Sequence, residues 1–273
     1  MNIPFYQVDA FTKIPFKGNP AAVCIVDDTV TETMMQQIAA ENNVSETAFV
    51  YRNEEGFQLR WFSPVVEVPL CGHATLATAH VLWEEGIVPK QETITFNTLS
   101  GWLSAAQHDG WIALNFPSLL GHQVPLPQEI RDILGVNPVN AMFILNRYLV
   151  ELATEAEVRA LTPDFSRLVN HPRIVVTAKG DPGSPFDFIS RMFAPCVGIN
   201  EDPVTGAAHC ALAPYWAQQL GKQSMTAYQA SARGGVVKVR QEGDRTVFSG
   251  EAVTVIKGTY TLNPSYATAT LSN

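Results

Sequence analysis

The chain has 273 residues, of which 46% are hydrophobic and 16% are charged, and its formal net charge is −8. This composition indicates one large or two moderate globular domains and excludes a disordered chain. The acidic balance, with no cluster of Lys or Arg, argues against nucleic acid and anionic membranes as partners, and no apolar run approaches membrane-spanning length.

The chain opens on MNIPFYQVDAF, which predicts a strand and has neither the basic start nor the apolar core of a secretion signal. We therefore expect a cytoplasmic protein. The four cysteines are scattered without a CxxC pair, so the spacing predicts neither a disulfide framework nor a structural zinc site. We expect no bound metal.

The next elements are a GNPAAV segment, an apolar strand and an acidic-started helix, TETMMQQIAAEN. We expect Asn19 of GNPAAV to lie in a loop. Glu46 follows in NVSETAFVY, on the turn between that helix and the strand TAFVY. A loop carboxylate commonly contacts only water. The strand would instead fix Glu46 at the end of the sheet, where partial burial would raise its pKa and let it accept and return a proton.

PLCGHATLATAHVLWEEG follows the alternating strand RWFSPVVEV and predicts a helix that ends near Gly86. Cys71, Gly72 and His73 therefore lie where a strand passes into a helix. The first amide groups of a helix have no partner within it, so this position can hold an anion. His73 could either help to cap the helix or take part in catalysis, and the residues alone favour neither role.

The chain repeats itself at half its length. Four residues of the first copy, spaced by two, recur in register in the second copy: Arg60, Phe62, Pro64 and Val66 match Arg191, Phe193, Pro195 and Val197. The repeat predicts two similar α+β domains, each a mainly antiparallel or mixed sheet around a glycine-led helix. The Pro- and Gly-rich FPSLLGHQVPLPQE places the boundary so that the domains span 1–117 and 118–261, with the tail 262–273 returning to the first.

In the second copy, INEDPVTGAAHCAL places Asp202 just before a predicted helix that starts near Gly206 and Ala207. An acid at this position could simply stabilise the helix N-terminus. Asp202 corresponds in position to the Cys-Gly-His of the first copy, which suggests that the two segments act on the same ligand. We expect the two helix starts to face an interdomain cleft and hold one substrate carboxylate, with Asn19 lining the cleft.

Four segments in this order resemble the motifs of the PhzF family: DAFTKIPFKGNPAAV, NVSETAFV, RWFSPVVEVPLCGHATLA and EDPVTGAAHCAL. These phenazine biosynthesis-like isomerases share the diaminopimelate epimerase-like fold, and the resemblance covers nearly the whole chain. It implies an α+β protein of two pseudo-symmetric domains, each a mostly antiparallel, barrel-like sheet around a central helix. It also implies a homodimer and a reaction without metal or organic cofactor.

The resemblance implies an isomerase that moves a carbon-bound proton on a small carboxylate-bearing substrate. Glu46 would carry the proton as general acid/base, while His73 and Asp202 would position the substrate and stabilise its charge. The residues expected to bind substrate are Asn19, Cys71, Gly72, Gly206 and Ala207.

Two other functions stay open. An amino-acid epimerase or racemase of this fold would use Cys71 and a second, facing thiol. The second copy has no thiol at the matching place, since Cys210 lies about one helical turn further on. A protein that binds a small metabolite without chemistry is the third possibility, although all three polar residues of the isomerase pattern are present.

Overall fold

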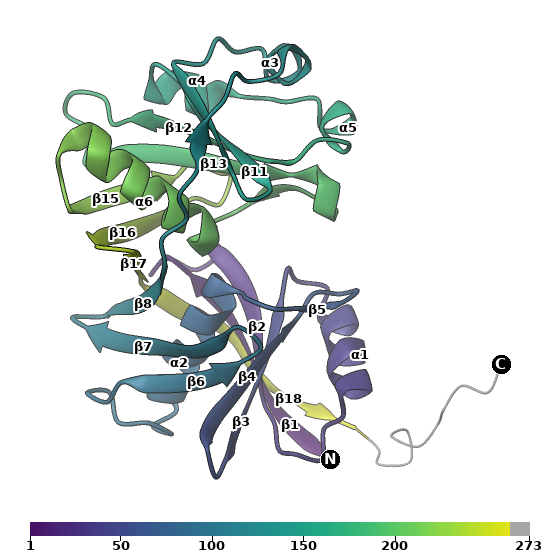
Figure 1. Cartoon of the computed structure of the whole chain (residues 1–273). Helices are drawn as coiled ribbons and strands as arrows, with labels where there is room; N and C mark the ends of the chain where they lie inside the picture. Colours follow the sequence, from purple (N-terminus) through teal and green to yellow (C-terminus); the bar gives the residue numbers. More distant parts are fainter. Residues whose placement is uncertain (263–273) are drawn as a thin grey trace. The chain divides into compact units, whose positions relative to one another are not determined.

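The computed structural model describes residues 1–262, which form two compact units (Figure 1). The first unit comprises residues 1–16, 20–114 and 251–262, and the second comprises residues 17–19 and 115–250. The chain returns to the first unit at its end because β18 (Ala252–Thr261) pairs antiparallel with β1 (Asn2–Ala10).

These units differ from the predicted domains at three places: residues 17–19 and 115–117 belong to the second unit, and residues 251–261 belong to the first. The sequence assigns residues 252–261 to the second domain, whereas their ladder to β1 places them in the first unit. A pairing between the two ends of the chain leaves no local signal, so sequence patterns could not locate it. The predicted return of 262–273 lies outside the described residues except for Leu262, whose carbonyl accepts a hydrogen bond from the Met1 amino group at 2.8 Å.

The first unit is a mostly antiparallel sheet with two parallel pairs, β2–β3 and β4–β6. Besides β1 and β18, its strands are β2 (Asn19–Ile25), β3 (Thr47–Asn53), β4 (Gly56–Phe62), β5 (Glu67–Val68), β6 (Ile94–Thr98), β7 (Gly101–His108) and β8 (Trp111–Pro117). Helix α1 (Glu32–Asn42) begins after Thr31, whose side chain accepts a hydrogen bond from the Met34 amide, and it packs on β3 and β4.

Helix α2 (Gly72–Glu84) forms the core of the first unit. It contacts β1, β3, β7 and β18, strands that come from widely separated parts of the sheet, so the sheet curves around the helix. Its residues are buried from Ala74 to Ala79 and again from Val81 to Trp83. A helix that is apolar almost all round is stable only when surrounded by protein, which is the position α2 has.

The second unit also combines a mixed sheet with helices. Its strands are β9 (His122–Gln123), β10 (Asn140–Ile144), β11 (Arg147–Glu151), β12 (Arg173–Lys179), β13 (Phe188–Ala194), β14 (Ile199–Asp202), β15 (Ser224–Gln229), β16 (Gly235–Glu242) and β17 (Arg245–Gly250). Its helices are α3 (Gln128–Leu134), α4 (Glu155–Ala160), α5 (Phe165–Leu168) and α6 (Gly206–Leu220), with a 3₁₀ turn η1 (Pro195–Val197). The pairs β11–β12 and β13–β15 are parallel, and the pairs β10–β11, β12–β13, β15–β16 and β16–β17 are antiparallel.

Helix α6 is the buried helix of the second unit and packs on β15, β16 and β17. Trp216 of α6 stacks on Phe188 with ring centroids 5.7 Å apart, and its indole N–H donates to the Thr177 hydroxyl at 3.0 Å. A separate apolar core lies between the short helices α3, α4 and α5 and strands β11 to β13. Within residues 1–262, no helix is both long and apolar enough to cross a membrane.

Candidate active site

Glu46 is held at the start of β3. Its carbonyl accepts a hydrogen bond from the Ala22 amide of β2 at 3.2 Å, and Thr47, the first residue of β3, is fully buried. The Glu46 side chain is 23% exposed. The strand therefore fixes the backbone of Glu46 while its side chain stays partly exposed.

The start of α2 is formed by Cys71 and the two residues after it. Cys71 has an extended backbone, and its carbonyl accepts from both the amide and the hydroxyl of Thr75, at 3.1 and 2.6 Å. The Cys71 side chain makes no capping bond to the helix. The amides of the first turn, at Gly72 and His73, lack acceptors within the helix, so α2 begins with donors directed along its axis.

The His73 imidazole lies between the Cys71 thiol and the Glu46 carboxylate. Its Nδ1 is 3.4 Å from Sγ of Cys71, and its Nε2 is 3.4 Å from Oε2 of Glu46. The second distance is longer than a good hydrogen bond, and Nε2 is buried without a bond of proper geometry. We call Glu46, Cys71 and His73 the SET–CGH cluster, after the segments that supply them.

Burial sets the charge of the imidazole. His73 is 6% exposed, and this burial lowers its pKa to about 4. The cause is the loss of hydration, which disfavours the protonated ring. At neutral pH the ring is therefore uncharged, with one nitrogen that donates and one that accepts a hydrogen bond.

We expect the free energy of unfolding to fall as the pH drops from about 6.5 to about 4. Burial lowers the pKa of His209 to about 4 as well, so in this window the unfolded chain binds a proton at both histidines while the folded chain does not. Their contribution is complete above pH 6.5 and is lost on acidification. Urea unfolding as a function of pH measures it, and His73→Gln should show a shallower fall than the wild type.

Asp202 has the opposite effect on the pH dependence of the free energy of unfolding. Burial raises its pKa to about 6, so below this pH the folded chain binds a proton at Asp202 more readily than the unfolded chain does. The comparison of His73→Gln with the unchanged protein removes that contribution, since Asp202 is present in both. Equal slopes in the two proteins would mean that folded His73 titrates at its ordinary pKa.

The residue types of the SET–CGH cluster are also metal ligands. One ligand atom from each residue lies within 4.8 Å of the other two. However, the thiol adjoins Nδ1 and the carboxylate adjoins Nε2, and one ion takes only one ring nitrogen. The present arrangement fits a chain of proton donors and acceptors better than a closed metal site, and the expectation of no bound metal stays a prediction.

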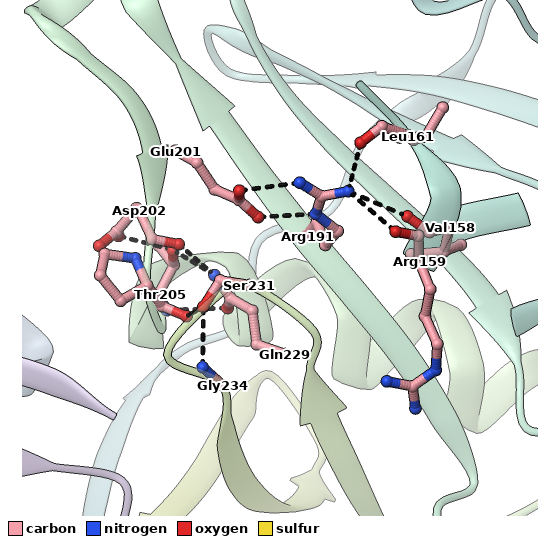
Figure 2. A network of polar contacts seen from close by, with 11 residues as sticks. Val158, Arg159, Leu161, Arg191, Glu201, Asp202, Thr205, Gln229, Ser231 and Gly234 are labelled. Atoms are coloured by element: carbon pink, nitrogen blue, oxygen red, sulfur yellow. Dashed lines mark hydrogen bonds and ion pairs between the residues drawn. The ribbon is translucent and has the colours of Figure 1, made fainter. Parts of the chain in front are cut away.

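A second polar cluster surrounds Asp202 in the second unit (Figure 2). The Asp202 carboxylate accepts from the Asn19 amide at 2.8 Å and from the Thr205 hydroxyl at 2.6 Å. Gln229 donates to the Asp202 carbonyl at 2.8 Å and accepts from the Thr205 amide at 2.8 Å. The carboxylate therefore does not cap α6, which begins at Gly206 and continues through Ala207; it is fixed by side chains.

Two features of this cluster differ from the sequence analysis. Asn19 does not lie in a loop but is the first residue of β2; it is fully buried and also donates to the Val204 carbonyl at 2.9 Å. Gln229 carries no local signal that would mark it, because it acts on residues 24 and 27 positions earlier in the chain. Only folding brings these amides to Asp202.

The predicted site residues thus form two groups within the described chain. Glu46, Cys71, Gly72 and His73 meet in the first unit, and Asn19, Asp202, Gly206 and Ala207 lie together in the second. That both groups act on one substrate stays a prediction.

The sequence of this chain matches a known protein family. The family model PhzC-PhzF, described as phenazine biosynthesis-like protein, matches residues 8–258. The chain belongs to this family. The PhzC-PhzF chain is 47% identical over 260 residues to an uncharacterized isomerase of Halalkalibacterium halodurans, an alignment that covers 94% of this chain and 98% of the relative.

Solved structures support the same assignment. A PhzF-family crystal structure from Enterococcus faecalis is 41% identical with a TM-score of 0.91, and the match covers 96% of this chain and 100% of that one. A hydroxyproline epimerase from Agrobacterium vitis, solved with trans-4-OH-L-proline, has a TM-score of 0.60 at 12% identity, covering 97% of this chain and 94% of that one. The second match shows that the two proteins share a fold.

Proposed function

We propose that the protein is an isomerase that moves a carbon-bound proton on a small carboxylate-bearing substrate without a cofactor, with Glu46 as general acid/base. The observation that carries the proposal is the SET–CGH cluster: a partly exposed carboxylate 3.4 Å from a buried imidazole, at the start of a buried helix. The isomerase names of the relatives agree with it.

Each residue has a defined task in this reaction. The Glu46 carboxylate takes a proton from one carbon, and the electrons of that C–H bond move into the conjugated system of the substrate as an enolate. Glu46 then returns the proton to a different carbon, which regenerates the carboxylate. Neutral His73 can donate a hydrogen bond to the developing oxyanion, and the first-turn amides of α2 favour its negative charge.

The roles of the second group, around Asp202, are proposed from the sequence alone. Asp202, with Asn19, would hold a polar group of the substrate, and the amides near Gly206 and Ala207 would favour a negative one. A homodimer and a cytoplasmic location also belong to the proposal. Size-exclusion chromatography with light scattering would test the first of these.

We further infer that the two units arose by duplication. The matching arginines of the sequence repeat have matching contacts: Arg60 forms a bidentate pair with Glu67 at 2.7 Å, and Arg191 forms one with Glu201 at 2.7 and 2.8 Å. Each guanidinium also lies over the phenylalanine two residues later, Phe62 or Phe193, at 5.2 and 4.9 Å from the ring centroid. The agreement of both contacts supports a duplication over a chance similarity of two α+β segments.

The test is a search for substrate followed by isotope exchange. Small cyclic and amino-acid carboxylates that raise the melting temperature would be incubated with the protein in deuterium oxide. Deuterium at a specific carbon of the recovered compound, seen by NMR, would support proton transfer. Tight binding without exchange for every hit would show instead a metabolite-binding protein without chemistry.

A cysteine-dependent epimerase is the second candidate, because the Cys71 thiol lies 3.4 Å from a ring nitrogen that can accept its proton. If Glu46 carries the proton, Cys71→Ala should lower turnover less than tenfold, since the thiol would contact the imidazole without taking up the substrate proton. Steady-state kinetics on the identified substrate checks this. A loss of a hundredfold or more in Cys71→Ala, and none in Glu46→Gln, would establish the thiol mechanism.

A further inference from the structure

Arg147 is a buried arginine in the second unit. It is the first residue of β11, opposite Ile144 across the β10–β11 hairpin, and it is 7% exposed. The hairpin turn beside it is open to solvent: Leu145 has a positive φ of 55° and is 69% exposed. The Arg147 side chain is therefore enclosed by protein, while the turn next to its backbone is accessible.

The guanidinium has no anionic partner in the described chain. Its Nε and Nη1 atoms are buried and form no hydrogen bond within residues 1–262. The neighbouring strand β12 places Arg173 in register with Arg147, and the charge of Arg173 acts on the guanidinium as a second cation. Burial, together with Arg173, lowers the pKa of Arg147.

The nearby thiol does not supply the missing charge. Cys210 of α6 interacts electrostatically with Arg147, but burial raises the pKa of this thiol to about 12. It is therefore neutral at physiological pH. Arg245 also acts on Cys210, so the surroundings of the thiol have an excess of positive charge.

A second arginine of the same unit, Arg191, has the hydrogen-bond partners that Arg147 lacks among residues 1–262. Arg191 is almost as buried, with its side chain 11% exposed, and it holds Glu201 by two hydrogen bonds and the Leu161 carbonyl by a third (Figure 2). Buried charges in folded proteins are paired, because an unpaired one loses its hydration without compensation. Among residues 1–262, no such partner is found for Arg147.

We propose that Arg147, with Arg173 beside it, anchors a binding site for a small oxyanion in the second unit. The planar guanidinium offers parallel N–H donors that match two oxygens of a phosphate or carboxylate group. The ligand would reach it by way of the exposed turn at Leu145. This inference does not depend on the proposed isomerase reaction.

The experiment measures binding without turnover. The wild-type protein would be titrated by calorimetry with inorganic phosphate and separately with acetate, and melted in each salt against sodium chloride of equal ionic strength. We expect one of the two anions to raise the melting temperature by about 5 °C near saturation, since a ligand that binds only the folded state stabilises it. The anion that does so distinguishes a phosphate site from a carboxylate site.

Arg147→Met should weaken the binding of that anion more than tenfold, and Arg147→Lys should weaken it less. In anion-free buffer Arg147→Met should melt no lower than the wild type, because it removes an unpaired buried charge. Arg240→Met is the matched control, since it removes an exposed arginine of the same unit and should bind as the wild type does. Equal anion affinity in Arg147→Met and wild type, or no effect of either anion on the wild type, would overturn the proposal.

Discussion

Glu46→Gln should lower kcat about a thousandfold on any substrate whose carbon-bound proton the protein exchanges. Glutamine keeps the shape of the side chain but cannot take up and return a proton, and general acid–base catalysis contributes factors of about 10² to 10⁴. Substrate binding should change little, because the amide can still donate and accept hydrogen bonds. Deuterium incorporation by NMR gives kcat, and calorimetry gives the dissociation constant.

The matched control is Glu41→Gln, which removes an exposed carboxylate from α1 of the same unit and should leave kcat unchanged. It separates the loss of a proton carrier from a general effect of charge. Full exchange activity in Glu46→Gln, with the control also active, would mean that another group moves the proton.

Arg191→Met should lower the free energy of unfolding of the second unit by about 3 kcal/mol, the range found when one partner of a buried ion pair is removed. Arg191 joins β13 to Glu201 of β14 and to the Leu161 carbonyl after α4 (Figure 2). The variant leaves the Glu201 carboxylate, only 17% exposed, without its cation. Urea unfolding followed by circular dichroism would measure the loss.

Two further variants make the result specific. Arg240→Met breaks the pair of Arg240 with Glu242, whose side chains are 56% and 45% exposed, and should cost less than about 1 kcal/mol. Adding Glu201→Met to Arg191→Met should recover part of the loss, because no buried charge is then left unpaired. If Arg191→Met were as stable as Arg240→Met, the buried pair would contribute little and the argument from burial would be wrong.

The sequence by itself determined the local features of the site. The helices that follow Cys71 and Thr205 begin at Gly72 and Gly206, as their apolar periodicity and leading glycines predict. Glu46 directly precedes a strand, since TAFV is a continuous buried run. The family could be recognised from four motifs because each one is a short, continuous segment.

Only the tertiary structure decided which side chains meet. Asn19 reaches Asp202 from 183 residues away, and β18 returns to β1 from the other end of the described chain. Arg147 is buried in register with Arg173, without an anionic partner among residues 1–262. Local propensity depends on neighbours within a few residues, whereas these contacts depend on how distant strands align. The same holds for His73, for which the sequence leaves open whether it caps the helix or takes part in catalysis. Its place between the Cys71 thiol and the Glu46 carboxylate follows from the packing of α2 inside the sheet.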